Sequence, residues 1–275
     1  MTRVALLQAQ TGIDPAANAK ALAAAVAEAA ADGAAMLFTP EMSGLLDRDR
    51  QRAAANLRVP EEDPVLAAVR EAAAKAGIWV HLGSLAVRRS DEPRLANRAF
   101  LIDGAGVIRA CYDKLHLFDV DLPTGESWRE SASYAPGEAA VVADTPVGPL
   151  GLAICYDLRF PDLFRVLTDA GAKLIAIPAA FTVPTGEAHW HVLMRARAIE
   201  AGVFVIAAAQ AGRHEDGRET YGHSLVVGPW GEVLLDMGQT PGLAFADIDL
   251  AAVDAVRARV PAIAHRRAIP AVIRR

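Results

Sequence analysis

Cys155 is the first side chain in this 275-residue sequence whose type and place could do chemistry. It stands in Gly151–Pro161 (GLAICYDLRFP), where an apolar run typical of a buried strand breaks into a turn. A nucleophile at the end of a strand is exposed at the edge of a sheet, as in other strand–turn–helix nucleophile sites. The alternative is a buried and inert cysteine, which is the commoner fate of a free thiol. Position alone does not decide between the two interpretations.

A catalytic thiolate needs a base, and histidine usually supplies it. The chain has 7 histidines, and their spacing does not select one of them. A carboxylate whose pKa is raised by burial can serve instead. Glu41 follows the expected strand Ala35–Thr39 one residue past Pro40, where its side chain would point into a crevice. Taken alone, a solvated loop carboxylate is the simpler interpretation of Glu41.

Lys114 follows the expected strand Val107–Tyr112. A buried ammonium beside a thiol lowers the pKa of that thiol below its usual value of about 8.5. The same ammonium stabilises the oxyanion that forms when a thiolate attacks a carbonyl. The alternative is an ordinary surface lysine.

Together, Glu41, Lys114 and Cys155 resemble, in their order and contexts, the Glu–Lys–Cys triad of the nitrilase superfamily, the carbon–nitrogen hydrolases. The resemblance extends over almost the whole chain, up to Arg267. The segments that carry it are Arg3–Gln10, Tyr112–Pro123 (YDKLHLFDVDLP), Cys155–Pro161 (CYDLRFP), Thr185–Ile199 (TGEAHWHVLMRARAI) and Tyr221–Gly231 (YGHSLVVGPWG).

The resemblance implies an α/β fold, a four-layer α-β-β-α sandwich of two mixed sheets. Residues 1–275 would form a single carbon–nitrogen hydrolase domain, with a core over about residues 1–267 and a C-terminal tail in dimer contact. The protein would be a homodimer or a higher homo-oligomer. Its partner would be a small-molecule amide substrate, and it would need no cofactor and no metal.

The resemblance also implies a role for each site residue. Cys155 would be the nucleophile, Glu41 the general base and acid, and Lys114 the residue that stabilises the oxyanion. The backbone N–H of Tyr156 would be a second oxyanion donor. Glu130, in the segment Trp-Arg-Glu-Ser, would position the triad.

Three further residues would line the substrate site. They are Arg159, Phe181 and Thr185. Arginine binds a carboxylate through two parallel hydrogen bonds, so Arg159 would hold the carboxylate of an α-keto acid. An ion pair between Arg159 and Asp157 is the alternative.

Within the superfamily, the sequence resembles the Nit-type amidases. The segment Ala207–His214 (AAAQAGRH) is more similar to the amidases of deaminated glutathione than to the ω-amidases of α-ketoglutaramate. The expected reaction converts the amide of an α-keto acid to a carboxylate and ammonia through a thioester. An N-carbamoyl amino acid hydrolase, a catalytically silent scaffold protein and a redox-sensing thiol stay open as alternatives. His191 is a departure, because many relatives carry glutamate there.

The elements that must position these residues alternate between strand and helix. Two hairpin signals interrupt the alternation, which favours mixed sheets over purely parallel ones. Helices are expected at Pro15–Asp32, Asp63–Ala76, Phe160–Gly171, Glu187–Ala201 and Leu250–Arg259. The other expected strands are Val4–Gln8, Ile78–Val87, Phe100–Asp103, Leu150–Ile154, Leu174–Ile177, Val203–Ala208, Ser224–Val227, Val233–Leu235 and Phe245–Ile248.

Composition limits the class of protein. With 53% hydrophobic and 22% charged residues, the chain is not disordered. A net charge of -5 argues against a nucleic-acid binder. The two cysteines, Cys111 and Cys155, form no disulfide framework and no CxxC pair, which favours a reducing, cytoplasmic compartment and no structural zinc. No apolar run has the length of about 20 residues that spans a bilayer, so no membrane is expected as a partner.

Overall fold

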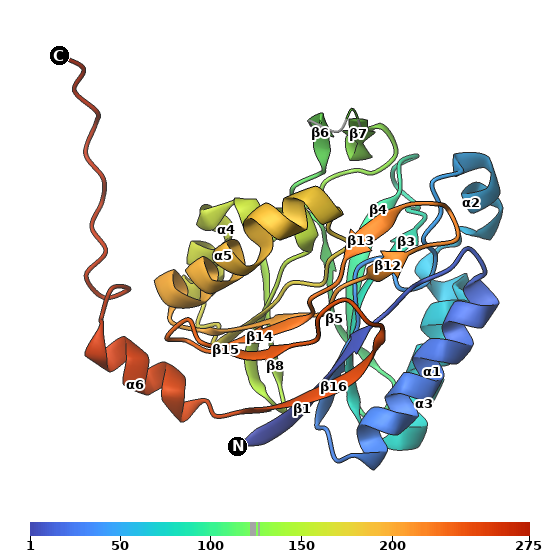
Figure 1. The fold of residues 1–275 in the computed structure, drawn as a ribbon, viewed down its shortest axis with the longest axis horizontal. Coiled ribbons are helices and arrows are strands. Elements are labelled where there is room, and N and C mark those ends of the chain that lie inside the picture. The colour runs from blue at the N-terminus through green and yellow to red at the C-terminus, as the bar shows by residue number, and fades with distance from the viewer. Residues whose placement is uncertain (122–124, 126) are drawn as a thin grey trace.

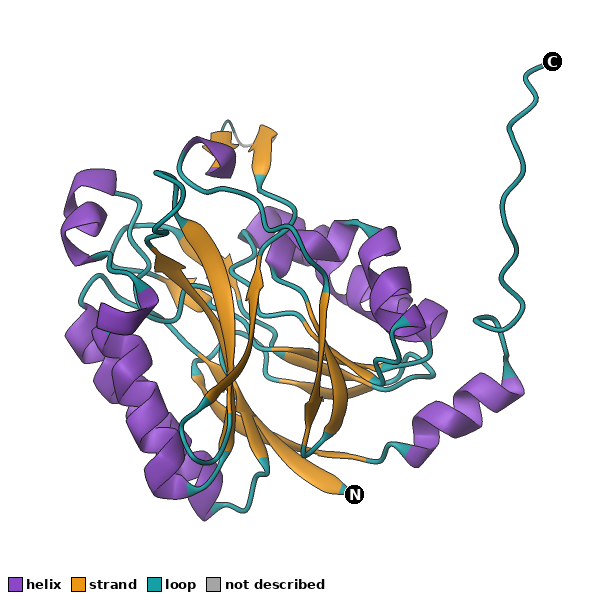
Figure 2. Cartoon of the chain, turned by 180° about the vertical axis from the view of Figure 1, so that it is seen from behind, coloured by secondary structure: helices purple, strands orange, loops and turns teal. Residues whose placement is uncertain are grey.

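Two mixed β-sheets lie face to face in the computed structural model of the chain, which describes residues 1–121, 125 and 127–275. Helices cover the outer face of each sheet, so four layers follow one another (Figure 1, Figure 2). The predicted α-β-β-α sandwich is therefore confirmed. Helices cover one face of each sheet and the opposite sheet covers the other face. This explains why nearly every central strand is apolar along its whole length.

The first sheet has the strand order β16-β1-β2-β3-β4-β5. Its two central pairings, β1 with β2 and β2 with β3, are parallel, and the flanking pairings are antiparallel. The bounds are β1 (Thr2–Gln8), β2 (Met36–Phe38), β3 (Trp79–Val87), β4 (Ala96–Ile102), β5 (Ile108–Asp113) and β16 (Gly242–Ile248).

The second sheet repeats this plan in the order β15-β14-β11-β10-β9-β8. Here β9, β10 and β11 are parallel neighbours, and the outer strands are again antiparallel. The bounds are β8 (Val141–Thr145), β9 (Gly148–Leu152), β10 (Leu174–Ala176), β11 (Phe204–Ala207), β14 (Leu225–Val227) and β15 (Val233–Asp236). Two short ribbons stand apart, β6 (Asp119–Asp121) with β7 (Ser127–Arg129) and β12 (Ala211–Arg213) with β13 (Glu219–Tyr221).

The helices divide between the two outer layers. The helices α1 (Pro15–Ala31) and α3 (Pro64–Ala76) cover the first sheet, while α4 (Pro161–Asp169) and α5 (Val183–Ala201) cover the second (Figure 2). A short helix α2 (Arg50–Asn56) follows β2, and α6 (Ala251–Arg259) follows β16. Beyond α6 the chain runs away from the body as an extended tail (Figure 1). No helix in the described part of the chain is long and apolar enough to cross a bilayer.

Alternation along each strand builds two cores. Leu6 of β1 and Phe38 of β2 lie in the core shared with the second sheet. Their neighbours Ala5 and Leu37 point the other way and pack against α1 and α3. This follows from the two-residue period of a strand.

Helix boundaries agree with their end signals, with one exception. Asp63 caps α3 by accepting hydrogen bonds from two backbone N–H groups, and Gly77 ends that helix with φ 69°. The helix α5 begins at Val183, four residues before the predicted start at Glu187, because Pro184 fits the first turn of a helix. Thr185 is therefore a helical residue. The sequence analysis did not predict α2 or the two short ribbons.

Candidate active site

Three strand ends meet at one end of the sandwich. Glu41 follows β2, Lys114 follows β5 and Cys155 follows β9. All three residues are buried, and Lys114 keeps 2% of its surface exposed. The structure thus brings together the three residues that the sequence analysis had taken from distant segments.

Lys114 lies between two carboxylates. Its Nζ donates to Glu41 Oε1 over 2.9 Å and to Glu130 Oε2 over 2.9 Å. The backbone N–H of Phe118 donates to Glu130 Oε2 over 2.7 Å and holds that carboxylate in place. Glu130 is therefore a direct partner of the lysine.

Asn97 of β4 belongs to the same cluster, and the sequence analysis missed it. Its Nδ2 donates to Glu41 Oε1 over 2.9 Å and to Glu130 Oε1 over 3.1 Å. The backbone N–H of Ala180 donates to the other Glu41 oxygen, Oε2, over 3.0 Å. Every strong contact of Glu41 therefore favours its charged form. Asn97 carries no local motif, and only the register of β4 places it beside Glu41.

Cys155 sits on a strained turn. Its φ is 48°, in the left-handed region that residues other than glycine rarely adopt, and it opens a five-residue 3-10 helix. The thiol lies near enough to the Glu41 carboxylate and the Ala180 N–H for both groups to shift its pKa. In the described part of the chain, Cys155 N–H donates to Pro178 and Asp157 N–H to Ile154, and the intervening Tyr156 N–H donates to no protein group.

Asp157 ties this turn to the end of β5. One of its oxygens accepts from Tyr112 Oη over 2.6 Å and from Ile154 N–H over 2.8 Å. The other accepts from the backbone N–H of His116 over 3.0 Å. Asp157 is fully buried by these contacts. The sequence alternative in which Asp157 pairs with Arg159 is therefore wrong.

The charge state of Glu41 differs from the expectation. Burial by itself raises the pKa of its carboxyl, but the Lys114 ammonium and the hydrogen bonds from Cys155, Lys114 and Asn97 outweigh burial, so the pKa lies below its ordinary value. The sequence analysis expected a carboxyl whose pKa is raised by burial. Glu41 is instead an ionised acceptor at neutral pH.

The charge state of Cys155 also differs from the expectation. Burial raises the pKa of the thiol most, and the Glu41 carboxylate raises it further, while Lys114 lowers it. The net shift is upward, because burial and Glu41 together outweigh Lys114. Lys114 lowers the thiol pKa as expected, but the expectation that this pKa lies below its usual value is wrong for the free protein. Sulfur keeps its proton next to a carboxylate that can accept it.

A cavity of about 820 Å³ opens above these groups. Arg159, Phe181 and Thr185, the three predicted substrate residues, all line it. Phe181 packs edge-on against Trp190 with ring centroids 4.8 Å apart, and Thr185 exchanges a 2.8 Å hydrogen bond with Thr182. Both residues are thus held in fixed positions on the wall of the cavity.

Four cavity arginines, Arg48, Arg50, Arg88 and Arg159, pair with no carboxylate among the described residues, and two of them lie over aromatic rings. Arg159 lies over the rings of Tyr156 and Phe181, and its Nη2 is 3.3 Å from His189 Nδ1. Arg48 lies over the Trp128 ring at 5.9 Å. The cavity can therefore neutralise an anionic ligand at two separate places.

Comparison with known proteins identifies the family of this chain. The carbon-nitrogen hydrolase family profile matches residues 3–258. The chain belongs to the carbon–nitrogen hydrolase family. The predicted membership of the nitrilase superfamily is thereby confirmed. The prediction of a hydrolase that acts on carbon–nitrogen bonds is confirmed as well.

Named relatives of this carbon–nitrogen hydrolase include amidases. A deaminated glutathione amidase of Yersinia enterocolitica is 40% identical over 248 residues, which are 88% of this chain and 85% of that protein. The crystal structure of the Caenorhabditis elegans NitFhit protein has a TM-score of 0.89 and 38% identity, covering 97% of this chain and 65% of that one. The chain thus spans about two thirds of the worm protein.

A third relative carries a ligand on sulfur. A mutant amidase from Nesterenkonia sp. AN1, crystallised after Michael addition of acrylamide at its active site cysteine, has a TM-score of 0.78 and 28% identity. The match covers 95% of this chain and 98% of that one.

The predicted motif Tyr112–Pro123 lies only partly in the described part of the chain, because positions 122 and 123 fall outside it. Cys111 lies exposed on β5 and forms no disulfide. A group of two histidines and an aspartate that could hold a metal ion lies outside the cavity lining.

Proposed function

We propose that the protein is a cysteine amidohydrolase with Glu41, Lys114 and Cys155 as its catalytic triad. The observation that carries this proposal is the contact of one carboxylate, Glu41, with both the Cys155 thiol and the Lys114 ammonium. A protonated nucleophile, an ionised base and a fixed cation in one buried place are the parts that acyl transfer requires. Glu130 and Asn97 hold the lysine and the base in position.

The first half of the reaction forms a thioester. Glu41 takes the thiol proton while the sulfur of Cys155 attacks the amide carbonyl carbon. The negative charge that develops on the carbonyl oxygen is stabilised by Lys114 and by the backbone N–H of Tyr156. Loss of one such donor typically costs about 2.7–4 kcal/mol of barrier. Glu41 then gives its proton to the leaving nitrogen, the C–N bond breaks, and the amine departs.

The second half of the reaction releases the acid. Glu41 takes a proton from a water molecule, whose oxygen attacks the thioester carbonyl. The C–S bond breaks, the proton returns to sulfur, and a carboxylate leaves. Glu41 thus serves as a base and an acid in turn, which its position between sulfur and substrate allows.

For the substrate we propose an α-keto-acid amide, with deaminated glutathione as first candidate. That compound has a carboxylate on each side of the scissile amide, and the unpaired Arg159 and Arg48 offer a cation for each. We assign Arg159 to the carboxylate of the keto acid. The cavity of about 820 Å³ lies within the range of about 300–1,000 Å³ of ligand sites. A named amidase relative supports the same substrate.

The expected release of ammonia needs a correction, because the leaving group depends on the amide that is cleaved. In deaminated glutathione the amide nitrogen belongs to cysteinylglycine, so hydrolysis releases that dipeptide and α-ketoglutarate. Ammonia is the product only for a primary amide such as α-ketoglutaramate. The assay must therefore follow both products.

The test compares three substrates with the wild-type chain. Deaminated glutathione, α-ketoglutaramate and an N-carbamoyl amino acid are each supplied, and cysteinylglycine, ammonia and α-ketoglutarate are measured. We expect the highest kcat/KM with deaminated glutathione. A higher kcat/KM with the primary amide would make the protein an ω-amidase, and turnover of the carbamoyl compound alone would refute the keto-acid assignment.

Two cysteine variants decide the triad. Cys155→Ser should lose at least about 10³-fold in kcat/KM, since the other triad groups cannot act without the sulfur. Cys111→Ser is the matched control, because Cys111 is exposed on β5. Its activity should equal that of the wild type. Equal activity of Cys155→Ser would dismiss the proposed mechanism.

We also propose that residues 1–275 are one domain that forms a homodimer and works in the cytoplasm. An exposed apolar surface supports the dimer. It contains Val192 and Ile199 of α5, Trp230, and Val233 and Leu234 of β15. Surfaces of this kind mark protein contacts. A reducing compartment suits an enzyme that needs its thiol free.

A further inference from the structure

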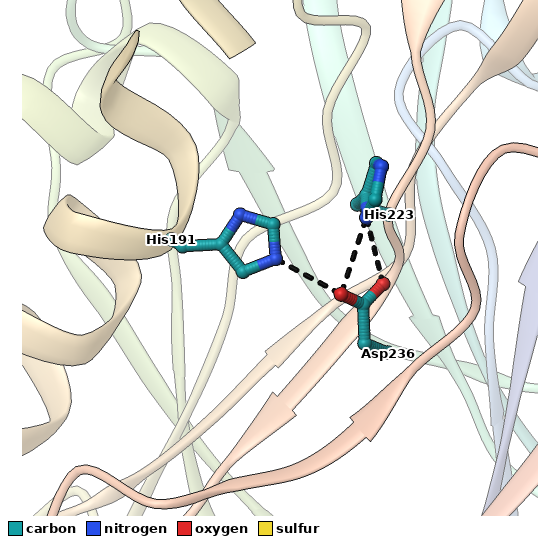
Figure 3. A group of neighbouring side chains, drawn as sticks. All are labelled: His191, His223 and Asp236. Carbon is teal, nitrogen blue, oxygen red and sulfur yellow. Dashed lines mark hydrogen bonds and ion pairs between the residues drawn. The ribbon is translucent and has the colours of Figure 1, made fainter. Parts of the chain in front are cut away.

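Two histidines and an aspartate from three separate segments meet outside the cavity (Figure 3). His191 lies on α5, His223 follows β13, and Asp236 ends β15. Their side chains are 34%, 20% and 33% exposed, so solvent and ions reach them. None of the three lines the cavity that holds Cys155.

One oxygen is the common centre of this group. Asp236 Oδ2 lies 3.0 Å from His191 Nε2 and 3.2 Å from His223 Nδ1. His223 Nδ1 also lies 2.9 Å from Asp236 Oδ1, so the carboxylate faces both ring nitrogens, and Oδ2 is the oxygen that both of them reach (Figure 3). A tetrahedral zinc ion with bonds of about 2.0–2.1 Å needs its ligand atoms about 3.3 Å apart. The two nitrogen–oxygen distances need to grow by a few tenths of an ångström, and the two ring nitrogens lie within 4.8 Å of each other.

Contacts with neighbouring backbone and side-chain groups hold Asp236 and His223 in place. The N–H of Gly238 donates to Asp236 Oδ1 over 2.9 Å and fixes the orientation of the carboxylate. His223 has φ 53°, a strained value, and Trp190 Nε1 donates to its carbonyl oxygen over 2.8 Å. The Tyr221 ring stacks on the His223 ring at 4.4 Å. Outer partners of this kind orient ligands in metal sites.

We propose that His191, His223 and Asp236 bind one divalent transition-metal ion of the zinc class, with water as the fourth ligand. Two imidazoles and one carboxylate suit Zn²⁺ and Co²⁺ better than the oxygen-seeking Ca²⁺ or Mg²⁺. The ion replaces the protons that the ring nitrogens otherwise share with Asp236. The sequence analysis found no such site, because its ligands are far apart in the chain.

The bound ion links α5 to the strands beneath it. The helix also carries Thr185 of the cavity wall, and Gly186 of the same turn packs on Tyr221. An ion that binds the folded state alone stabilises it, and it raises Tm as its concentration exceeds Kd. The inference does not depend on the proposed function, since it concerns a site that does no chemistry on the amide.

Metal binding is measured on the full chain in a Cys111→Ser, Cys155→Ser background, so that no thiol can hold the ion. Chelator-stripped protein is dialysed against Zn²⁺ or Co²⁺, and bound metal, the visible spectrum of Co²⁺ and Tm are recorded. We expect one ion per chain, a four-coordinate cobalt spectrum and a rise in Tm.

Variants locate the ion. His191→Gln and Asp236→Asn should each weaken binding at least about tenfold and abolish the rise in Tm. His265→Gln changes an exposed histidine outside the group and should bind metal like the parent. Binding below one ion per chain, or affinity unchanged in His191→Gln, would overturn the proposal and leave a hydrogen-bonded cluster only. Circular dichroism verifies that each variant folds.

Discussion

At the scale of the residue, the active site depends on whether one proton lies on the Cys155 thiol or on the Glu41 carboxylate. Burial and Glu41 both raise the pKa of Cys155, whereas Lys114 and two further donors, Cys155 and Asn97, lower the pKa of Glu41. The free protein therefore stores a thiol beside a carboxylate. Substrate must supply the electrophile before the proton moves, which protects the sulfur from other reactions, because the thiolate is the reactive form.

The resting thiol gives a direct test of this arrangement. The difference in thiolate absorbance between the wild type and Cys155→Ser should show no step up to about pH 8.5, the ordinary pKa of a thiol, because burial and Glu41 raise the pKa of Cys155. Cys111→Ser, treated alike, reports the other thiol. A step of one thiolate per chain below about pH 8 would contradict the direction of this shift.

Asn97 offers a test of positioning. Asn97→Ala removes a donor to both Glu41 and Glu130, so kcat/KM should fall by about 10- to 100-fold. Because the lost hydrogen bond favours the charged carboxylate, the pKa of Glu41 should rise, and the acid limb of the kcat/KM profile should move to higher pH.

Asn18→Ala is the matched control for Asn97. Asn18 donates to the backbone of Gly12 and Gly44 and to no active-site carboxylate, so its loss should change stability and leave the pH profile in place. An unmoved acid limb in Asn97→Ala would remove Asn97 from the positioning role.

Arg159 is tested through binding. Arg159→Met should raise KM for a keto-acid amide by about 10- to 100-fold, since a hydrogen bond between charged groups contributes about 1.5–3 kcal/mol. The change in kcat should be smaller. A simple amide without a carboxylate is the control substrate and should lose nothing. Equal losses for both substrates would assign Arg159 a structural role.

At the scale of the element, one buried network joins two strand ends. Asp157 fixes the turn that carries Cys155 to Tyr112 of β5, two residues before Lys114. A strand end is otherwise free to move, and a nucleophile must stay within a fraction of an ångström of its base. The position of Tyr112 on β5 therefore helps to fix the geometry of the active site, although its side chain lies outside the cavity lining.

Tyr112→Phe should lower the free energy of unfolding by about 1.5–3 kcal/mol, measured by urea denaturation, because it removes the 2.6 Å hydrogen bond of a hydroxyl to a buried carboxylate. It should also lower kcat. Tyr221→Phe is the control, since in the described residues the Tyr221 hydroxyl makes no hydrogen bond to protein. Equal stability of Tyr112→Phe and wild type would show that Asp157 is held by its backbone donors alone.

At the scale of the whole molecule, the two halves of the sandwich differ in what covers them. The first sheet is covered by α1 and α3, and the second by α4 and α5 (Figure 2). The outer side of α5 exposes Val192 by 68% and Ile199 by 53%, beside Trp230 at 54%. An exposed apolar surface supports the proposed homodimer, because surfaces of this kind mark protein contacts.

The tail beyond α6 is tested by truncation. Removal of residues 268–275 should leave Tm unchanged in the monomer, because those side chains are exposed and lie away from the body (Figure 1). If the tail contacts the partner, the dimer dissociation constant should rise, as measured by light scattering over a dilution series. Trp230→Arg serves as the comparison at the apolar surface. A chain that is monomeric in wild type at every concentration would refute the dimer.

The sequence by itself determined the family and the four-layer fold, and it proposed the residues of the triad. Apolar runs, hairpin glycines and helix caps depend on neighbours within a few residues, so Asp63, Gly77 and the strand that leads into Cys155 could be predicted. The start of α5 was missed because Thr182 makes no side-chain cap there, leaving only a weak end signal.

Only the tertiary structure decided the charges and the long-range partners. Whether the pKa of the thiol lies below or above its usual value depends on burial and on Glu41, which together outweigh Lys114 and reverse the expected sign. Asn97 entered the site through strand register, and His191, His223 and Asp236 met through packing. Desolvation and Coulomb interactions depend on distance in space, which spacing along a chain does not determine.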